Sequence, residues 1–528
     1  MNDEPIFQPK TDRSPLTRRG FMTRALATGL SVAAASTLWE RLAKAAPTHG
    51  GHLRLGLAGG STADTLDPSP WGDTFMVVVG YAVRGGLTEF AADGTLKPDV
   101  AQSWEASDAA KKWTFKLQKG ATFSNGKSVT AEDVIASLNF HRGEKSKSGA
   151  KAIFEPVSDI RADGNDTVVV TLSSGVVDFP YSLTDHHINI FPSVDGQADW
   201  RSGIGAGPYV LENFEPGVRA ILKRNPNSHK SAYLESAELL GVSDVVARQA
   251  ALTSGRVDAI NRVDLKTANL LGRQKGIRVE ESTGRLHYWL TANTTIEPFN
   301  HNDVRTALKY AIDREALLKV IFAGHGRIGN DQPITPAYRY HDASLAPKAY
   351  DPDRARFHLK KAGFDSLTLD FHTSDAAFNG AVDLGVLYQQ QAGKSGININ
   401  VVREPPDSYW ANIRSAAPSW YSTYWSGRAT EDTMFTVGLA KDSPWNYSRW
   451  ANPDFNRILI EARQETDEAK RRELYYQLQR ITSDDSGVII PIFANSVYAV
   501  GDKVQHPTDV AGNWELDGGR LIERWWVA

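Results

Sequence analysis

The spacing of apolar positions predicts a fold that mixes strands and helices. Residues 113–117 (WTFKL) alternate apolar and polar side chains, as a half-buried strand does. A helix is expected next, because Thr130 can cap its first turn and Asp133, three residues later, completes a capping box. Residues 303–322 carry apolar side chains at helical spacing, and Asp313 is placed to cap a second helix within that range.

A strand–helix–strand unit follows in the second half of the chain. Apolar side chains alternate over 367–371 and again over 397–401, and those at 381–392 fall on one face of a helix that Gly396 should end. Two strands joined by one helix over about 35 residues should lie parallel, with a right-handed crossover.

Two later segments complete the predicted pattern. Asn452-Pro453 predicts the start of another helix, since the pair offers a cap followed by proline in the first turn. Residues 488–493 are apolar throughout, as in a buried strand. A length of 528 residues suggests about three or four folding units, so the expected fold class is α/β or α+β in several domains.

Composition excludes several classes of function. Hydrophobic residues make up 41% and charged residues 23%, which is ordinary for a chain with a large core. A net charge of −3, from 59 basic and 62 acidic residues, argues against a nucleic-acid partner, which would need a basic face. The absence of cysteine excludes disulfides, thiolate metal sites, iron–sulfur clusters, a cysteine nucleophile and a lipidated cysteine anchor.

The first 45 residues have the pattern of an export signal. Residues 17–22 (TRRGFM) hold paired arginines before phenylalanine, a mildly apolar stretch follows at 25–38, and 43–45 (AKA) suit a cleavage site near Ala45. This order resembles the twin-arginine signal, although that signal usually has lysine at the position of Thr23. A membrane anchor is the alternative, but fourteen weakly apolar residues are fewer than the roughly twenty that a bilayer needs.

Removal of this segment leaves an acidic chain. Residues 1–45 hold seven basic and four acidic side chains, so the remainder has 52 basic and 58 acidic residues and a net charge of −6. It contains no further apolar run of membrane-spanning length, so no stable membrane insertion is expected. The expected location is the periplasm of a bacterial or archaeal cell, and the lack of cysteine suits that oxidising compartment.

Catalytic and cofactor motifs give no support for an enzyme. The chain has neither a phosphate-binding GxxxxGK[ST] loop nor a GxSxG nucleophile motif. The glycines at 203, 205 and 207 have the wrong spacing for a dinucleotide loop and precede a strand-like segment. His186 and His187 are adjacent, and neighbours on a strand point to opposite faces, which disfavours a metal site there. No cofactor, metal or catalytic residue is therefore predicted.

The positive signal is a cluster of aromatic residues at 420–428 (WYSTYWSGR). One interpretation is a core strand whose rings, including those of Tyr421 and Tyr424, pack inward. The other is a ligand pocket, since such sites combine apolar walls with a few polar groups. The turn favours the pocket, because glycine lets a backbone approach closely and arginine presents a fork for carboxylate or phosphate. The candidate ligand-binding residues in this cluster are Tyr424, Trp425, Ser426, Gly427 and Arg428.

Nine short segments carry a family resemblance that extends over almost the whole chain after residue 46. They are TLDP at 65–68, GGLTEF at 85–90, LKPDVAQSW at 96–104, the run 113–126, AEDV at 131–134, GPY at 207–209, SGRVD at 254–258, VR at 304–305 with AIDR at 311–314, and NPDF at 452–455. No single segment is specific, but together and in this order they resemble the bacterial extracellular solute-binding proteins of family 5. That family includes the dipeptide- and oligopeptide-binding proteins of ABC importers.

The resemblance implies a fold and a set of partners. The fold would be the two-lobed periplasmic-binding-protein fold (α/β, class II or cluster C type), with an extra domain inserted in the first lobe. The implied boundaries are 46–85, 200–290 and 490–528 for the first lobe, 86–199 for the inserted domain and 291–489 for the second lobe. Ligand would be buried between the lobes and delivered to a membrane permease powered by a cytoplasmic ATPase, with the binding protein monomeric by family default.

One departure from the family pattern concerns the ligand. Peptide-binding members carry a Trp-x-x-Asp motif whose aspartate pairs with the peptide α-ammonium, whereas Trp425 is followed here by Arg428. A cation facing an ammonium in a closed cleft would be repulsive by several kcal/mol, on order-of-magnitude Coulomb grounds. Either Glu431 or Asp432 binds the ammonium instead, or the ligand is an opine or acidic saccharide. In a further alternative, Arg428 forms a structural salt bridge with Asp432.

The remaining candidates are placed by the resemblance near the cleft. They are Trp71, Asp73, Asn293, Trp445 and Asn446. The leading hypothesis is a periplasmic protein that binds a peptide or a peptide-sized solute. The alternatives are a binder of an opine, an acidic sugar or a metal chelate and, from a different class, an exported hydrolase or cofactor enzyme.

Overall fold

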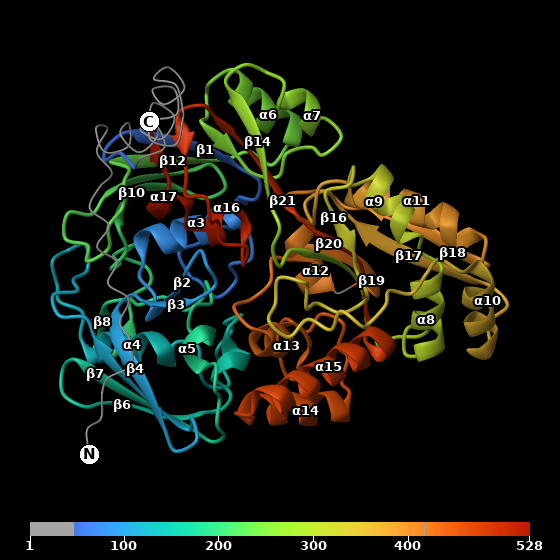
Figure 1. Ribbon diagram of the computed structural model, residues 1–528, viewed down its shortest axis with the longest axis horizontal. Helices are drawn as coiled ribbons and strands as arrows, with labels where there is room; N and C mark the ends of the chain where they lie inside the picture. The colour runs from blue at the N-terminus through green and yellow to red at the C-terminus, as the bar shows by residue number, and fades with distance from the viewer. Residues whose placement is uncertain (1–46, 417) are drawn as a thin grey trace, which may run out of the picture. The chain divides into compact units, whose positions relative to one another are not determined.

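The computed structural model describes residues 47–416 and 418–528, and the predicted signal segment at 1–45 lies outside these residues. The body from His49 to Val527 is built around two large mixed sheets and a smaller antiparallel sheet, with helices packed on them (Figure 1).

The first large sheet has seven strands that come from both ends of the body. Their order is β10 (Tyr209–Glu215), β11 (Arg219–Arg224), β12 (Ser236–Gly241), β1 (His52–Leu57), β13 (Ala259–Ile260), β21 (Ser496–Gly501) and β14 (Ile277–Ser282). β1 runs parallel to β12 and β13, and the other pairs are antiparallel. Helix α3 (Thr74–Val83) is buried along its whole length against this sheet, and Asp73 caps its first turn.

The second large sheet has six strands. Their order is β16 (Gly326–Ile328), β20 (Val488–Ala494), β15 (His287–Ala292), β19 (Trp420–Trp425), β17 (Leu367–Thr373) and β18 (Ile397–Arg403). The predicted strand–helix–strand unit is confirmed, because β17 and β18 pair in parallel and are joined through α11 (Ala381–Gly393). That helix ends three residues before Gly396, where the prediction had placed its stop.

Helices that the sequence predicts flank the second sheet. α8 (Asn302–Tyr310) and α9 (Arg314–Val320) occupy the range 303–322, and the Asp313 side chain accepts a hydrogen bond from the Ala316 amide at 2.9 Å, as expected of a cap. α10 (Pro352–Lys361) packs on α8, and α14 (Pro453–Gln464) packs on α15 (Glu468–Asp485) (Figure 1). Asn452 caps α14 as predicted.

A four-stranded antiparallel sheet lies between residues 101 and 172. Its order is β4 (Ala101–Ser107), β5 (Lys112–Leu117), β7 (Thr167–Leu172) and β6 (Val157–Ala162). β5 confirms the strand predicted at 113–117, and α4 (Ala131–Asn139) begins with the predicted capping box of Thr130 and Asp133.

The other elements are short or cover these sheets. They are β2 (Thr88–Phe90), β3 (Leu96–Pro98), a 3-10 helix (Lys151–Phe154), α5 (Phe179–Ser182), β8 (Ser193–Val194), β9 (Gln197–Ala198), α6 (Val245–Thr253), α7 (Ala268–Leu271), α12 (Tyr409–Ala416), α13 (Glu431–Leu439), β22 (Val504–Gln505), α16 (Glu515–Gly518), α17 (Leu521–Arg524) and β23 (Trp526–Val527). Two of the boundaries predicted for the lobes, at 290/291 and 489/490, fall inside β15 and β20, and both strands belong whole to the six-stranded sheet.

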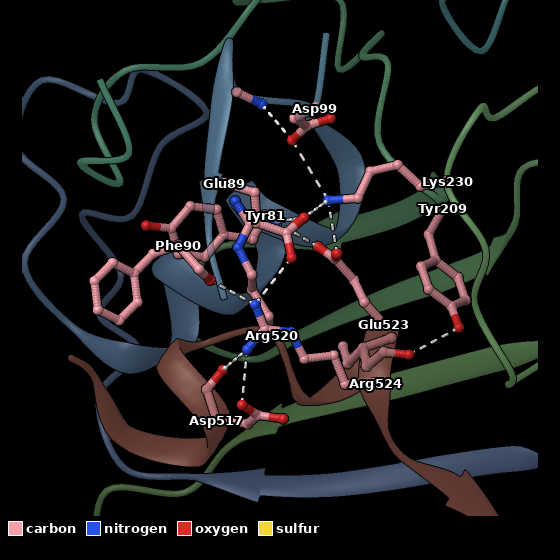
Figure 2. A network of polar contacts seen from close by, with 12 residues as sticks. Tyr81, Glu89, Phe90, Asp99, Tyr209, Lys230, Asp517, Arg520, Glu523 and Arg524 are labelled. Atoms are coloured by element: carbon pink, nitrogen blue, oxygen red, sulfur yellow. Dashed lines mark hydrogen bonds and ion pairs between the residues drawn. The ribbon is translucent and has the colours of Figure 1, made fainter. Parts of the chain in front are cut away.

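A buried network of charges fixes the C-terminal segment against the first sheet (Figure 2). The Lys230 ammonium lies 2.6 Å from a Glu89 carboxylate oxygen, 2.8 Å from one of Glu523 and 3.4 Å from one of Asp99. Arg524 bonds Glu89 at 2.9 Å and Asp517 at 2.7 Å. Because Glu523, Arg524 and Asp517 all follow Trp514 closely, the network also holds that tryptophan in place.

Candidate ligand-binding site

A cavity that is partly open to solvent, with about 560 Å³ of atom-free space including solvent at its mouth, lies where segments from distant parts of the chain meet. It is lined by Pro70, Gly72, Asp73, Trp410, Tyr424, Trp425, Ser426, Arg428, Trp445, Tyr447 and Trp514. Six of these eleven side chains are aromatic, so the cavity combines apolar walls with few polar groups, as small-molecule sites do.

Strand β19 supplies one wall of the cavity. All six of its residues are buried, and it pairs with β15 so that Tyr424 lies opposite Tyr288. The Tyr424 hydroxyl donates a hydrogen bond of 2.6 Å to the carbonyl of Gly72, which belongs to the segment before α3. The Arg262 guanidinium lies 4.5 Å from the centre of the Tyr424 ring. These contacts join the six-stranded sheet to segments packed on the seven-stranded sheet.

The turn after β19 requires glycine. Gly427 has a φ of +89°, and a β-carbon there would lie 2.3 Å from the β-carbon of Arg285. Arg285 donates hydrogen bonds of 2.7 Å to the carbonyls of Arg428 and Ala429, and the Arg428 amide donates to the Tyr338 hydroxyl at 2.8 Å. These hydrogen bonds hold the backbone of the turn in one conformation and so fix the direction in which the Arg428 side chain leaves it.

Arg428 already has a counter-ion. Its Nε lies 2.9 Å from Oδ2 of Asp185, and both side chains are almost fully buried. The guanidinium also lies 5.0 Å from the centre of the Trp425 ring and 6.0 Å from that of Trp514. The alternative of a structural salt bridge for Arg428 named the wrong partner. Asp432 bonds Arg463 at 2.9 Å instead of Arg428.

Asp185 belongs to a turn that also holds His186 and His187. The two imidazole rings lie 4.0 Å apart, so the expectation that they point to opposite faces of a strand is wrong. Each ring packs on a wall of the cavity, His186 on Trp514 and His187 on Trp445.

Electrostatics in this turn favour neutral imidazole beside an ionised carboxylate. Burial lowers the pKa of His186 well below its usual range. Burial alone would raise the pKa of Asp185, but the Arg428 cation and the hydrogen bond with His187 bring that pKa well below its ordinary value. Potential metal-ligating atoms of Asp185, His186 and His187 lie within 4.8 Å of one another, so these three side chains could contact one ion. Arg428 competes for the same carboxylate.

The segment before α3 contributes one carboxylic acid, Asp73, to the cavity wall, and Asp64 lies close enough to interact with it but outside the lining. Asp73 lines the cavity and accepts a hydrogen bond of 3.1 Å from the Met76 amide as the cap of α3. Burial raises the pKa of Asp73. Burial and the nearby charge of Asp73 raise the pKa of Asp64 to about 7. The ionisable groups near the cavity are thus of two kinds: cations that already have a counter-ion, and the acids Asp73 and Asp64.

The structure brings six of the twelve predicted ligand residues to the cavity wall, and their role in binding stays a prediction. These six are Asp73, Tyr424, Trp425, Ser426, Arg428 and Trp445. Gly427 shapes the turn between two of them. Glu431 accepts a hydrogen bond of 2.6 Å from the Tyr340 amide, and Asp432 pairs with Arg463, so neither carboxylate lines the cavity.

The other three predicted residues make structural contacts. Trp71 is packed in the core beside α3 and donates a hydrogen bond of 2.8 Å to the carbonyl of Thr65. Asn293 accepts a bond of 2.7 Å from the Thr295 hydroxyl, and Asn446 donates one of 2.7 Å to the carbonyl of Trp450.

Sequence reasoning missed five residues of the cavity wall: Pro70, Gly72, Trp410, Tyr447 and Trp514. Pro70 and Gly72 flank the predicted Trp71, and Tyr447 follows the predicted Trp445 and Asn446, so the right segments were found without these members. Trp514 comes from the C-terminal segment and no local pattern marks it as a pocket residue.

A second cavity of about 420 Å³ adjoins the first and shares Tyr424. Its polar wall includes Arg262 and Glu515, whose Nε and Oε1 lie 2.7 Å apart. Tyr424 therefore lines both cavities. Arg262, which lines the second cavity, is neutralised by Glu515.

Comparison with known proteins gives the family. The family described as "Bacterial extracellular solute-binding proteins, family 5 Middle" matches residues 95–447. The chain belongs to this family. Its members are the solute-binding components of ABC importers, so the predicted function as a periplasmic solute-binding protein is confirmed.

Curated relatives cover most of the chain. The probable D,D-dipeptide-binding periplasmic protein DdpA of Escherichia coli K12 is 27% identical over 469 residues, which are 84% of this chain and 90% of the relative. The glutathione-binding protein GsiB of the same strain is 26% identical over 478 residues, 87% of this chain and 91% of the relative.

Solved structures share the fold. The binding protein AgaA of A. tumefaciens R10, in complex with agropinic acid, has a TM-score of 0.83 and 25% identity over 90% of this chain and 99% of its own. DppA of Helicobacter pylori, in complex with the peptide STSA, has a TM-score of 0.82 and 21% identity over 93% of this chain and 100% of its own. The two-lobed periplasmic-binding-protein fold is thereby confirmed. Among residues 47–416 and 418–528, no helix combines the length and apolarity needed to cross a bilayer.

Proposed function

We propose that the protein captures a peptide-sized solute in the 560 Å³ cavity and presents it to the permease of an ABC importer. The segment 1–45 exports the chain to the periplasm and is removed near Ala45, and the binding protein acts as a monomer without catalysis. We keep the predicted lobes, with β15 and β20 assigned whole to the second lobe and the inserted domain at 86–199.

The observation that supports this proposal is the origin of the cavity walls. Pro70, Gly72, Asp73 and Trp514 come from segments of the proposed first lobe. The other seven wall residues lie in the proposed second lobe, between Trp410 and Tyr447. A solute held between such walls stabilises the closed arrangement, and closure around a ligand is how two-lobed binding proteins work.

The structure changes the weight of the ligand alternatives. The alternative of an opine or acidic sugar depended on Arg428 facing the ligand as a free cation. Since Asp185 already supplies the counter-ion, that argument loses its force. A peptide-sized solute with apolar or aromatic contacts remains the best-supported ligand, and the relatives named for dipeptides, glutathione and agropinic acid define the chemical range to test.

The test is a thermal-shift screen of the purified protein with di- to pentapeptides, glutathione, opines, acidic sugars and nickel chelates. A ligand at a hundred times its dissociation constant should stabilise the folded protein by about 2.7 kcal/mol. Small-angle scattering should then show a smaller radius of gyration with that ligand bound. Turnover of an ester, peptide or glycoside by the purified protein would instead support the exported hydrolase.

A matched pair of variants locates the site. Trp445→Leu removes a ring from the cavity wall and should weaken ligand binding at least tenfold, whereas Trp104→Leu alters a half-buried ring on β4, outside the cavity lining. Equal affinities in the two variants would show that the solute binds elsewhere.

A further inference from the structure

We propose that the cavity recognises a positively charged nitrogen on its ligand, held between Asp73 and the aromatic walls. This inference rests on the proposed function, because it names the chemical class of solute that the same cavity selects. It differs from the Trp-x-x-Asp arrangement of peptide-binding members, since the acid here comes from the wall opposite β19.

The aromatic walls form a nearly continuous surface. Trp445 contacts Trp425 and Tyr447, with ring centres 5.9 Å and 5.8 Å apart, and Trp410 contacts Tyr424 at 5.7 Å. The face of an aromatic ring carries partial negative charge, so a cation near several such faces is attracted without needing a hydrogen bond. Neutral apolar groups also fit such walls. The choice between a cationic and a neutral ligand group therefore depends on the ionisable residues around the cavity.

The cations near the cavity are already neutralised. Arg428 pairs with Asp185 at 2.9 Å, and Arg262, behind the ring of Tyr424, pairs with Glu515 at 2.7 Å. An anionic ligand that approached Arg428 would have to compete with the buried Asp185 carboxylate. Such a competition gains little, because the existing ion pair is itself shielded from water.

Asp73, which lines the cavity, and Asp64, which lies near it outside the lining, differ from these paired cations. Among the described residues, no ion pair within 4.0 Å includes Asp73 or Asp64, and the basic group that acts on Asp73 is the already paired Arg262. Burial disfavours ionisation of both acids, and a ligand cation would supply the missing charge. Because the Asp73 carboxyl lines the cavity and can ionise beside a ligand cation, a positive charge is the one that this wall can accept.

Unused polar atoms in the wall suggest a second feature of the ligand. Ser426 is 2% exposed, and within the part of the chain that the structure describes neither its hydroxyl nor the buried indole nitrogen of Trp425 has a hydrogen-bond partner. An indole nitrogen can only donate, so its partner on the ligand would be an acceptor oxygen. A small molecule that carries both a cationic nitrogen and an acceptor oxygen would pair with Asp73 through the first and with the Trp425 indole nitrogen through the second.

The probes are choline, carnitine, the dipeptide Ala-Ala and 3,3-dimethyl-1-butanol, which is the neutral isostere of choline. Titration calorimetry on the purified protein should give a dissociation constant at least tenfold lower for choline or carnitine than for the neutral isostere. If the cation is an unsubstituted ammonium, Ala-Ala shows the preference instead. The proposal is overturned if the neutral isostere binds as well as choline, or if none of the three cationic probes binds.

Asp73→Asn provides the matched variant. Asparagine caps helices about as well as aspartate does, so the variant keeps α3 and removes only the charge. It should weaken binding of the preferred cation at least tenfold and leave binding of the neutral isostere unchanged. Unchanged affinity for the cation would overturn the role of Asp73, while an unaltered far-ultraviolet spectrum shows that the variant is folded.

The ring requirement is tested separately by Trp445→Phe and Trp445→Leu. Phenylalanine keeps a ring face and should retain most of the affinity for the cation, whereas leucine should lose it. Equal loss in both would favour a purely steric role. Failure of this proposal is distinct from failure of the proposed function, because an anionic or neutral solute that binds and closes the lobes would leave the latter intact.

Discussion

Arg428 and Asp185 form a buried ion pair, with Nε and Oδ2 2.9 Å apart, between the turn that follows β19 and the turn that holds the two histidines. The pair explains how an arginine can occupy the place of the family's ligand-binding aspartate without leaving a free cation in the cavity. It joins segments of the proposed second lobe and inserted domain, so it bears on stability as well as on the ligand.

Arg428→Met should lower the free energy of unfolding by about 3 kcal/mol, because it leaves the Asp185 carboxylate buried without its cation. Adding Asp185→Asn should restore part of the loss, and urea unfolding of the two single variants and the double variant measures the coupling. Additive losses in the double variant would show that the pair contributes nothing. A loss of binding with unchanged stability would instead mark Arg428 as a ligand residue.

Lys230→Met should destabilise the protein strongly. Three carboxylates surround the Lys230 ammonium, and only 11% of its side chain is exposed (Figure 2). Without the cation, these acids repel one another in a poorly solvated place, which should cost about 3–5 kcal/mol. Lys266→Met is the control, because the Lys266–Asp383 pair is about half exposed and should contribute less than about 1 kcal/mol. Similar melting temperatures for both variants would contradict this expectation.

Gly427→Ala should displace the turn after β19. The added carbon would meet the Arg285 side chain at 2.3 Å, in a backbone conformation that alanine rarely adopts. We expect a loss of about 2 kcal/mol or more in unfolding free energy and a weaker ligand response. Gly393→Ala is the matched control, since Gly393 is helical with open space around its β position, and alanine there should stabilise by about 0.5–1 kcal/mol. A melting temperature of Gly427→Ala that equals or exceeds that of Gly393→Ala would contradict this expectation.

Asp64 should make the protein less stable as the pH rises from about 4 to about 7. Its pKa is about 7 in the folded protein and about 3.9 in an unfolded chain. Between these values the folded state keeps a proton that the unfolded state has released, so the free energy of unfolding falls with rising pH and levels off above pH 7.

Asp64→Asn removes this dependence. The variant should lose up to about 4 kcal/mol less than the unsubstituted protein between pH 4 and pH 8, as measured by urea unfolding at several pH values. Asp442→Asn, at an exposed position, controls for the substitution itself. Parallel stability curves for the unsubstituted protein and Asp64→Asn would refute the assignment.

The sequence predicted the elements whose signals are local. Asp313, Asn452 and the Thr130–Asp133 box mark helix starts because a cap involves only residues within one turn. The strand–helix–strand unit was predictable for the same reason, since its apolar period changes from two to 3.6 and back within one segment.

Contacts between residues far apart in the chain could not be predicted from the sequence. Arg428 was assigned to Asp432 because the two are four residues apart, yet the partner is Asp185, brought there by the tertiary fold. His186 and His187 were assigned to a strand, but they lie in a turn that directs both rings to the cavity wall. Trp514 reaches the cavity from the C-terminal segment, where its indole nitrogen donates to the Thr74 hydroxyl at 3.3 Å and its ring packs on His186, both far away in sequence.

The order of strands in the seven-stranded sheet has a consequence for the growing polypeptide on the ribosome. β1 pairs with β12 and β13, and β13 pairs with β21, so strands that begin at residues 52 and 496 flank the same two-residue strand. Nascent β1 must wait for nearly the whole chain to be translated before its sheet is complete. A chain that ends before residue 496 lacks β21 and therefore cannot complete this sheet, although β10, β11, β12, β1 and β13 can still pair.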